Sequence, residues 1–92
     1  MTPISQIRIY AMAIAGLLVH TLEEHVEDVR TRIGAIPGMS IYGIHEGVYI
    51  VTVAEFPSEF MEDEVEKLKD IEGVLTIYTT YVTVEDEMEN AE

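Results

Sequence analysis

The chain has 92 residues, of which 18 are acidic and 5 are basic, so its formal net charge is −13. A chain of this length folds around a single core, and its charge disfavours nucleic acid or an anionic membrane and favours a cationic partner. The absence of cysteine excludes disulfides, thiolate catalysis and cysteine-based metal sites, and agrees with a reducing compartment.

The first predicted element is a long strand. Residues 1–6 are expected to be loose, and residues 7–19 read as a β segment whose apolar second half suits a central strand. The apolar stretch 10–19 is much shorter than the roughly 20 residues that cross a bilayer. No small-x-small cleavage pattern follows it, so a mature strand is expected rather than a secretory signal.

The next segment predicts an amphipathic helix. Thr21 and Glu24 have the spacing of a capping box, and the helix should end at Gly34. Asp28 and Arg32 are spaced for an i, i+4 ion pair on its wet side. Apolar residues recur on one face of this helix at Leu22, Val26, Val29 and Ile33.

A hairpin and a second helix follow. Glu46-Gly47 predicts a tight turn that joins residues 39–45 to residues 48–54 as antiparallel strands. Ser58 is the expected N-cap of the second helix. Its core stripe is expected to be Met61, Val65 and Leu68, continued by Ile71.

The last strand is expected at residues 74–84, which are rich in Thr, Tyr, Val and Ile. The acidic residues 85–92 are interpreted as a disordered tail. The domain is therefore assigned to residues 1–84, with residues 1–13 as an N-terminal extension that includes the start of the first strand.

The two halves of the chain resemble each other. Ala35-Ile-Pro-Gly and Asp70-Ile-Glu-Gly each end an amphipathic acidic segment and lead directly into a run of β-forming residues. Two such units predict an α+β fold of the ferredoxin-like βαββαβ type. Right-handed crossovers then give a four-stranded antiparallel sheet with both helices on one face.

The other face of this sheet is expected to be apolar. Side chains alternate between the two faces of a strand, so Ala15, Leu17, Val19, Tyr49, Val51, Val53, Leu75, Ile77 and Tyr81 are placed under the helices. The uncovered face should carry Ile14, Gly16, Leu18, Tyr42, Ile44, Val48, Ile50, Thr52, Val74, Thr76, Tyr78, Thr80 and Val82. Because no charged residue belongs to this set, it predicts a docking surface. A partner helix, an added strand, the N-terminal residues or a second copy of the chain are the ways to cover it.

The sequence offers little for catalysis. His20, His25 and His45 lack metal-ligand spacing, no serine lies in a nucleophile-elbow context, and no glycine-rich phosphate loop follows a strand. The segment Val19-His20-Thr21 is too short and plain to hold an anion. We therefore interpret the chain as a binding protein without enzymatic activity, metal or other cofactor.

Four motifs make the chain resemble the NapD family. They are Ile14-Ala-Gly-Leu-Leu-Val19, Ile36-Pro-Gly38, Ile50-Val-Thr-Val53 and Ile71-Glu-Gly-Val-Leu75, and the acidic C-terminal tail is also similar. The chain departs from the family pattern in its longer N-terminus, residues 1–13, and in Gly16, where the family often has serine.

The resemblance implies a cytoplasmic chaperone of the periplasmic nitrate reductase catalytic subunit. Such proteins bind the twin-arginine signal peptide of the precursor and delay export by the Tat pathway until the molybdenum cofactor is inserted. The arginine pair would then be attracted by Glu46, Glu85 and Asp86. The apolar run, expected to be helical when bound, would contact Ile14, Gly16, Leu18, Tyr42, Val48, Ile50, Thr52, Thr76 and Tyr78.

Two alternatives come from other classes. One is a small-ligand sensor of the same fold that binds amino acids, although residues 19–21 lack the Gly or Asp cluster that such a site needs. The other is a homodimer that buries the uncovered face and has no further partner.

Overall fold

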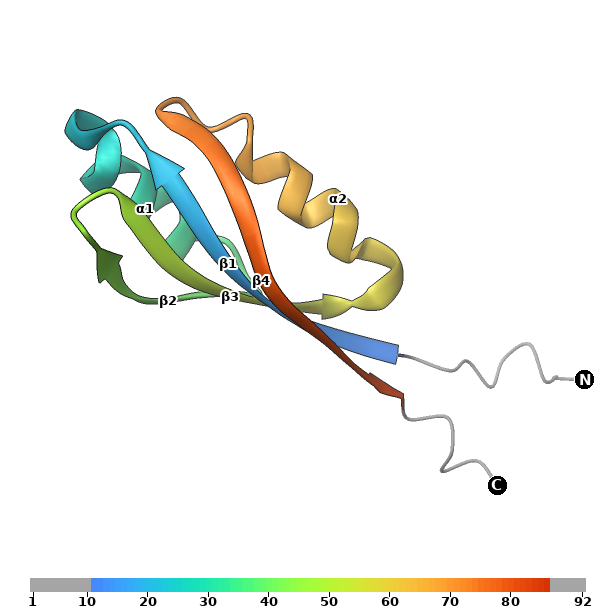
Figure 1. Cartoon of the computed structure of the whole chain (residues 1–92). Helices are drawn as coiled ribbons and strands as arrows, with labels where there is room; N and C mark the ends of the chain where they lie inside the picture. Colours follow the sequence, from blue (N-terminus) through green and yellow to red (C-terminus); the bar gives the residue numbers. More distant parts are fainter. Residues whose placement is uncertain (1–10, 87–92) are drawn as a thin grey trace, which may run out of the picture.

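The computed structural model describes residues 11–86, and its elements follow the order predicted from the sequence. A short 3-10 helix at Glu23–His25 leads into the first α-helix. The strands and α-helices are β1 (Ala11–Thr21), α1 (Val26–Gly34), β2 (Met39–His45), β3 (Tyr49–Pro57), α2 (Ser58–Leu68) and β4 (Val74–Asp86) (Figure 1).

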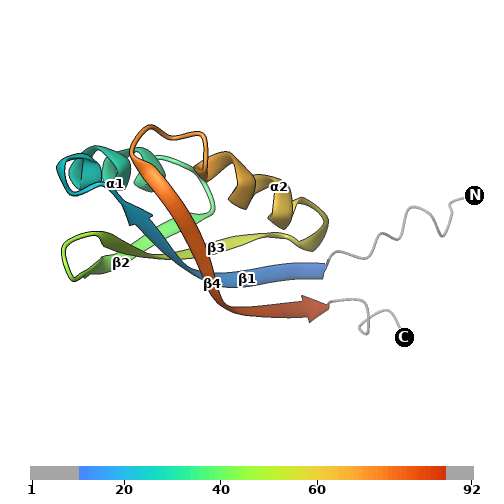
Figure 2. The ribbon, with the colours of Figure 1, turned by 45° about the horizontal axis from the view of Figure 1, so that its top comes forward.

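The four strands form one antiparallel sheet in the order β2-β3-β1-β4. Both helices lie over the same face of this sheet, and none of the described residues 11–86 forms a layer over the opposite face (Figure 2). The expected ferredoxin-like α+β fold is confirmed. The uncovered face is called the open face below.

Helix α1 packs through the predicted stripe. Val29 and Ile33 are fully buried and Val26 packs beside them, whereas Leu22 is exposed before the helix. The predicted capping box is wrong, because Thr21 is still part of β1 and its hydroxyl donates to the carbonyl of Leu22. The predicted ion pair on the wet side is confirmed, with Arg32 Nε 2.9 Å from Asp28 Oδ2.

Helix α2 also packs through its predicted stripe. Met61 and Leu68 are buried, and Val65 and Ile71 pack against the core. Ser58 is not the N-cap, because Pro57 precedes the helix in an extended conformation and Ser58 is the first helical residue. The helix therefore begins without a side-chain cap.

The hairpin between β2 and β3 forms at the predicted turn. Glu46 and Gly47 have φ values of 52° and 77°, the left-handed conformation that two-residue hairpin turns require. Strand β3 continues to Pro57, three residues beyond the expected end at position 54.

The core side of β1 is as predicted, but that of β3 is shifted by one residue. Ala15, Leu17 and Val19 are buried under the helices, whereas on β3 the buried residues are Ile50, Thr52 and Ala54. The prediction for β3 was wrong because residues 48–54 contain no charged side chain to identify a solvent face, and Thr52, which is polar, lies on the buried side. The Thr52 hydroxyl, which donates to the carbonyl of Ile50 at 3.4 Å, is satisfied locally despite its burial.

Irregularities in pairing change the faces of several edge-strand residues. In β4 the register shifts opposite Gly16 and Leu17, so that Tyr81 pairs with Gly16 on the open face and Val82 pairs with Ala15 on the helix side. A second shift lets Val74 pack against the core and leaves Leu75 exposed. These four assignments are therefore corrected.

Strand β2 has a similar irregularity between Ile41 and Gly43. Ile44 pairs with the buried Ile50 and so belongs to the helix side, not to the open face. At the C-terminal end, β4 runs to Asp86, past the expected start of the tail at residue 85. The predictions for residues 1–10 and 87–92 lie outside the described residues.

Candidate functional site

The open face is built from rows of cross-strand neighbours. Residues paired directly across an antiparallel sheet point to the same side, so the register fixes which side chains meet. From one end of the sheet to the other, the rows are His45, Tyr49, His20 and Thr76; then Gly43, Val51, Leu18 and Tyr78; then Val53, Gly16 and Tyr81; then Glu55, Ile14 and Thr83.

A hollow of about 480 Å³ lies in the middle of these rows. Gly16 is at its base, because a Cβ added there would be 2.5 Å from Cε2 of Tyr81 and 2.6 Å from Oγ1 of Thr80. The absence of a side chain at this position lets the Tyr81 ring lie against the strand. Besides Gly16, the hollow is lined with Ile14, Leu17, Leu18, Tyr42, Val51, Thr52, Val53, Glu55, Thr80 and Tyr81.

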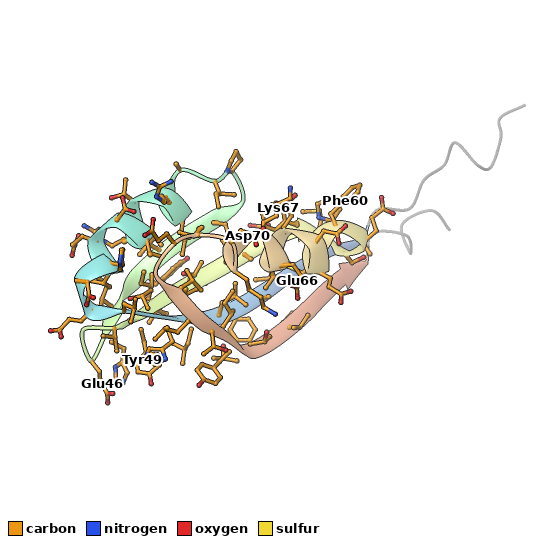
Figure 3. All side chains as sticks on the ribbon, turned by 90° about the horizontal axis from the view of Figure 1, so that it is seen from above. Glu46, Tyr49, Phe60, Glu66, Lys67 and Asp70 are labelled. Atoms are coloured by element: carbon orange, nitrogen blue, oxygen red, sulfur yellow. The ribbon has the colours of Figure 1, made fainter. Side chains whose placement is uncertain are left out.

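One end of the open face is a row of aromatic rings. His20 and Tyr49 are stacked with centroids 4.5 Å apart and planes at 20°, and His45 is tilted against Tyr49 at 6.4 Å. His45 Nε2 also lies 3.4 Å from the carboxylate of Glu46 in the hairpin turn. Figure 3 shows Glu46 and Tyr49 together at the end of the molecule away from Phe60 of α2.

The charges of the described residues are distributed unevenly. Among residues 11–86 the Lys and Arg side chains are Arg30, Arg32, Lys67 and Lys69. Each is paired with a carboxylate of α1 or α2, and Lys69 itself lies one residue beyond the end of α2. The hydrogen bond that Arg32 donates to the Asp28 carboxylate raises the pKa of Arg32. None of these four cations lines the hollow, whereas Glu55 does.

Most of the residues predicted to bind a ligand lie on the open face, but three do not. The structure places Ile14, Gly16, Leu18, Tyr42, Thr76 and Tyr78 on this face. Ile50 and Thr52 are fully buried on the helix side, although Thr52 is among the residues that line the hollow. The half-buried Val48 lies in the turn before β3. Of the predicted acidic residues, Glu46 is at the hairpin turn, while Glu85 and Asp86 pair with Met12 and Ala11 at the other end of β1.

Sequence reasoning missed Tyr49, Val51, Val53, Glu55 and Tyr81. Glu55 could have identified the solvent face of β3. A carboxylate is rarely buried without a partner, and the side chains of residues 51, 53 and 55 point to the same side of the strand. Ending the predicted strand at Ala54 hid that signal. No comparable signal marks the pairing shift that turns Tyr81 to the open face.

A second hollow, of about 410 Å³, lies on the helix side between α2 and β4. Its walls include Val65, Ile77 and Val82, and its rim carries Glu66 with its ion-pair partner Lys69. This hollow differs from the first in having a cation at its edge.

The described residues contain no cluster of three or more His, Asp or Glu side chains placed to hold a metal ion. Within the same part of the chain, no helix is long and apolar enough to cross a membrane. What the open face does offer is apolar contact area, aromatic rings and a carboxylate, which together suit an apolar ligand that carries positive charge.

Comparisons with known proteins agree on one family. The model of the NapD protein family matches residues 12–86. Chaperone NapD of Escherichia coli strain K12 is 28% identical over 78 residues, which cover 83% of this chain and 90% of the relative. The NapD chaperones of E. coli O157:H7 and Shigella flexneri match to the same extent.

A solved structure supports the same relationship. The solution structure of the E. coli Tat proofreading chaperone protein NapD superimposes with a TM-score of 0.70 at 25% identity. The match covers 76% of each chain.

Proposed function

Because the chain belongs to the NapD family, we propose that its open face binds the twin-arginine signal peptide of a precursor exported by the Tat pathway. The chain is a chaperone and not an enzyme. The precursor we propose is that of the periplasmic nitrate reductase catalytic subunit, held in the cytoplasm until its cofactor is inserted.

The observation that carries the proposal is the chemistry of the hollow on the open face. A twin-arginine peptide combines an arginine pair with an apolar run, so its receptor needs apolar surface next to carboxylates. The hollow has apolar walls at Leu18, Val51 and Val53 and a carboxylate at Glu55. Among residues 11–86, no Lys or Arg lies in it to repel the arginines.

The dimensions suit a bound helix. The rows from Gly16 to His20 extend over five residues of β1, roughly 13 Å of strand between the first and the last. A helical apolar run of about ten residues is roughly 15 Å long and would lie across the exposed ring of Tyr78. We keep Glu85 and Asp86, which pair with the first residues of β1, as carboxylates that attract the arginines over a distance. Glu46 lies in the hairpin turn near the other end of β1 and is not assigned this role.

Titration calorimetry with a synthetic signal peptide tests the proposal. The full chain should bind the twin-arginine peptide, and it should bind a peptide with both arginines changed to alanine at least about tenfold more weakly. Absence of binding to the twin-arginine peptide would refute the proposal.

The two alternative functions predict different results. A small-ligand sensor would be stabilised in a thermal-shift assay by free amino acids and not by the peptide. A homodimer without another partner would bind neither free amino acids nor the peptide. Light scattering would then give a mass well above the 10.4 kDa of one chain.

A further inference from the structure

We propose that Glu55 is the anchor for a guanidinium group of the signal peptide, so that the arginine pair lies at the Ile14 end of the open face. This inference rests on the proposed function, because it adds a contact and a direction to that binding mode. Glu55 was not among the residues expected to attract the arginines.

Glu55 has the surroundings that a guanidinium requires. Its exposed side chain lines the hollow together with Tyr42 and Tyr81, which come from the two edge strands. Arginine differs from lysine in pairing with a carboxylate through two parallel hydrogen bonds while its flat face stacks on an aromatic ring. A carboxylate and two phenol rings around one hollow therefore favour arginine over lysine.

The backbone of Glu55 is fixed by neighbours on both sides of β3. Glu55 lies opposite Ile14 of β1, and its backbone N–H donates to the carbonyl of Gly38 at 2.8 Å. A carboxylate on a fixed strand loses less conformational entropy on binding than one in a turn or a tail. This positioning suits Glu55 to a direct contact with a guanidinium group rather than to a long-range attraction.

The other carboxylates are less suitable as anchors. Glu46 is 67% exposed in the hairpin turn and already lies 3.4 Å from His45 Nε2. Glu27, Glu64 and Glu66 are paired with cations of their own helices. Within residues 11–86, Glu55 has no such ion pair.

The position of Glu55 also sets the direction of the peptide. With the arginines next to Ile14, the apolar run that follows them passes over Gly16 and Leu18 and ends near the rings of His20 and Tyr49. The peptide then runs along β1 in the direction of that strand. An anchor at Glu46 would give the opposite direction.

The test compares Glu55→Gln with its matched control Glu46→Gln by calorimetry. Both substitutions remove one exposed charge without changing side-chain size, and circular dichroism checks that both variants fold. Each is titrated with the twin-arginine peptide, with a twin-lysine peptide and with the peptide in which both arginines are alanine. The quantity compared is the ratio of the alanine-peptide Kd to the arginine-peptide Kd.

We expect this ratio to be about tenfold or more in the wild type and in Glu46→Gln, and to fall below about threefold in Glu55→Gln. The wild type should also prefer arginine to lysine, and Glu55→Gln should lose most of that preference. An unchanged ratio in Glu55→Gln, or a ratio lost only in Glu46→Gln, would overturn the assignment while leaving the proposed function intact. Failure of the wild type to bind the twin-arginine peptide would overturn both.

Discussion

Ile50 is completely buried under the helices, whereas Val51, the next residue of β3, lies on the open face. The two side chains are chemically similar and differ in what surrounds them. Removing methyl groups from a filled core leaves a cavity, while the same change on a solvent-facing sheet surface does not.

This difference predicts unequal effects of truncation on stability. Ile50→Ala should lower the free energy of unfolding by about 2 to 4 kcal/mol, because the residue is fully enclosed. Val51→Ala should cost about 1 kcal/mol or less. Urea denaturation of both variants measures the two values, and equal losses would contradict the register of β3.

At the residue scale, sequence reasoning succeeded where polarity marks a face and failed where it does not. The inward residues of β1 and the stripes of both helices were predicted correctly, except for Leu22, which is exposed before α1. Residues 48–54 contain no charged side chain, and Thr52 is buried despite its hydroxyl, so which of them face the core depends on the tertiary arrangement. Glu55, one residue beyond the predicted strand, carried the missing information.

At the element scale, the β2–β3 hairpin depends on two residues with left-handed backbone. Gly47 has φ 77°, and a Cβ added there would meet nothing within 4 Å. Replacing this glycine therefore changes backbone strain and not packing. Gly34, at the end of α1, is a useful contrast because its added Cβ would make an ordinary 3.8 Å contact with Ile41.

We expect Gly47→Ala to destabilise the fold by about 1 kcal/mol, because a side chain disfavours positive φ. Gly34→Ala should be neutral or stabilise by up to about 1 kcal/mol, since alanine is the better helix former. Thermal and urea unfolding of the two variants compare them directly. A Gly47→Ala variant as stable as the wild type would show that the turn adopts another conformation.

The elements themselves were predictable because they depend on local pattern. Glycine turns, the periods of the two helices and the hairpin signal gave the order and the antiparallel sheet. The pairing shifts in β2 and β4 were not predictable, because they arise from fitting edge strands to neighbours far away in the sequence. These shifts decide that Tyr81 belongs to the open face.

At the scale of the whole molecule, the sheet divides the protein into two surfaces with different charge patterns. The helix side carries all the ion pairs formed by Lys and Arg among the described residues, and its hollow has Lys69 at the rim. The open face has apolar walls and Glu55. A cationic, apolar peptide is complementary to the second surface.

Two lysine substitutions test this distinction most directly. Leu18 pairs with Val51 and Tyr78 on the open face, whereas Val82, which is 57% exposed, pairs with Ala15 on the helix side and lines the other hollow. Leu18→Lys and Val82→Lys add the same charge to opposite faces of the sheet. Circular dichroism and urea unfolding check that both variants remain folded.

The decisive measurement is the Kd of the twin-arginine signal peptide for each of these two variants by titration calorimetry. The open-face account predicts that Leu18→Lys weakens binding at least about 30-fold, as expected for a charge at the centre of an apolar contact, and that Val82→Lys stays within about threefold of the wild type. Wild-type affinity in Leu18→Lys together with lost binding in Val82→Lys would contradict the account and place the peptide between α2 and β4.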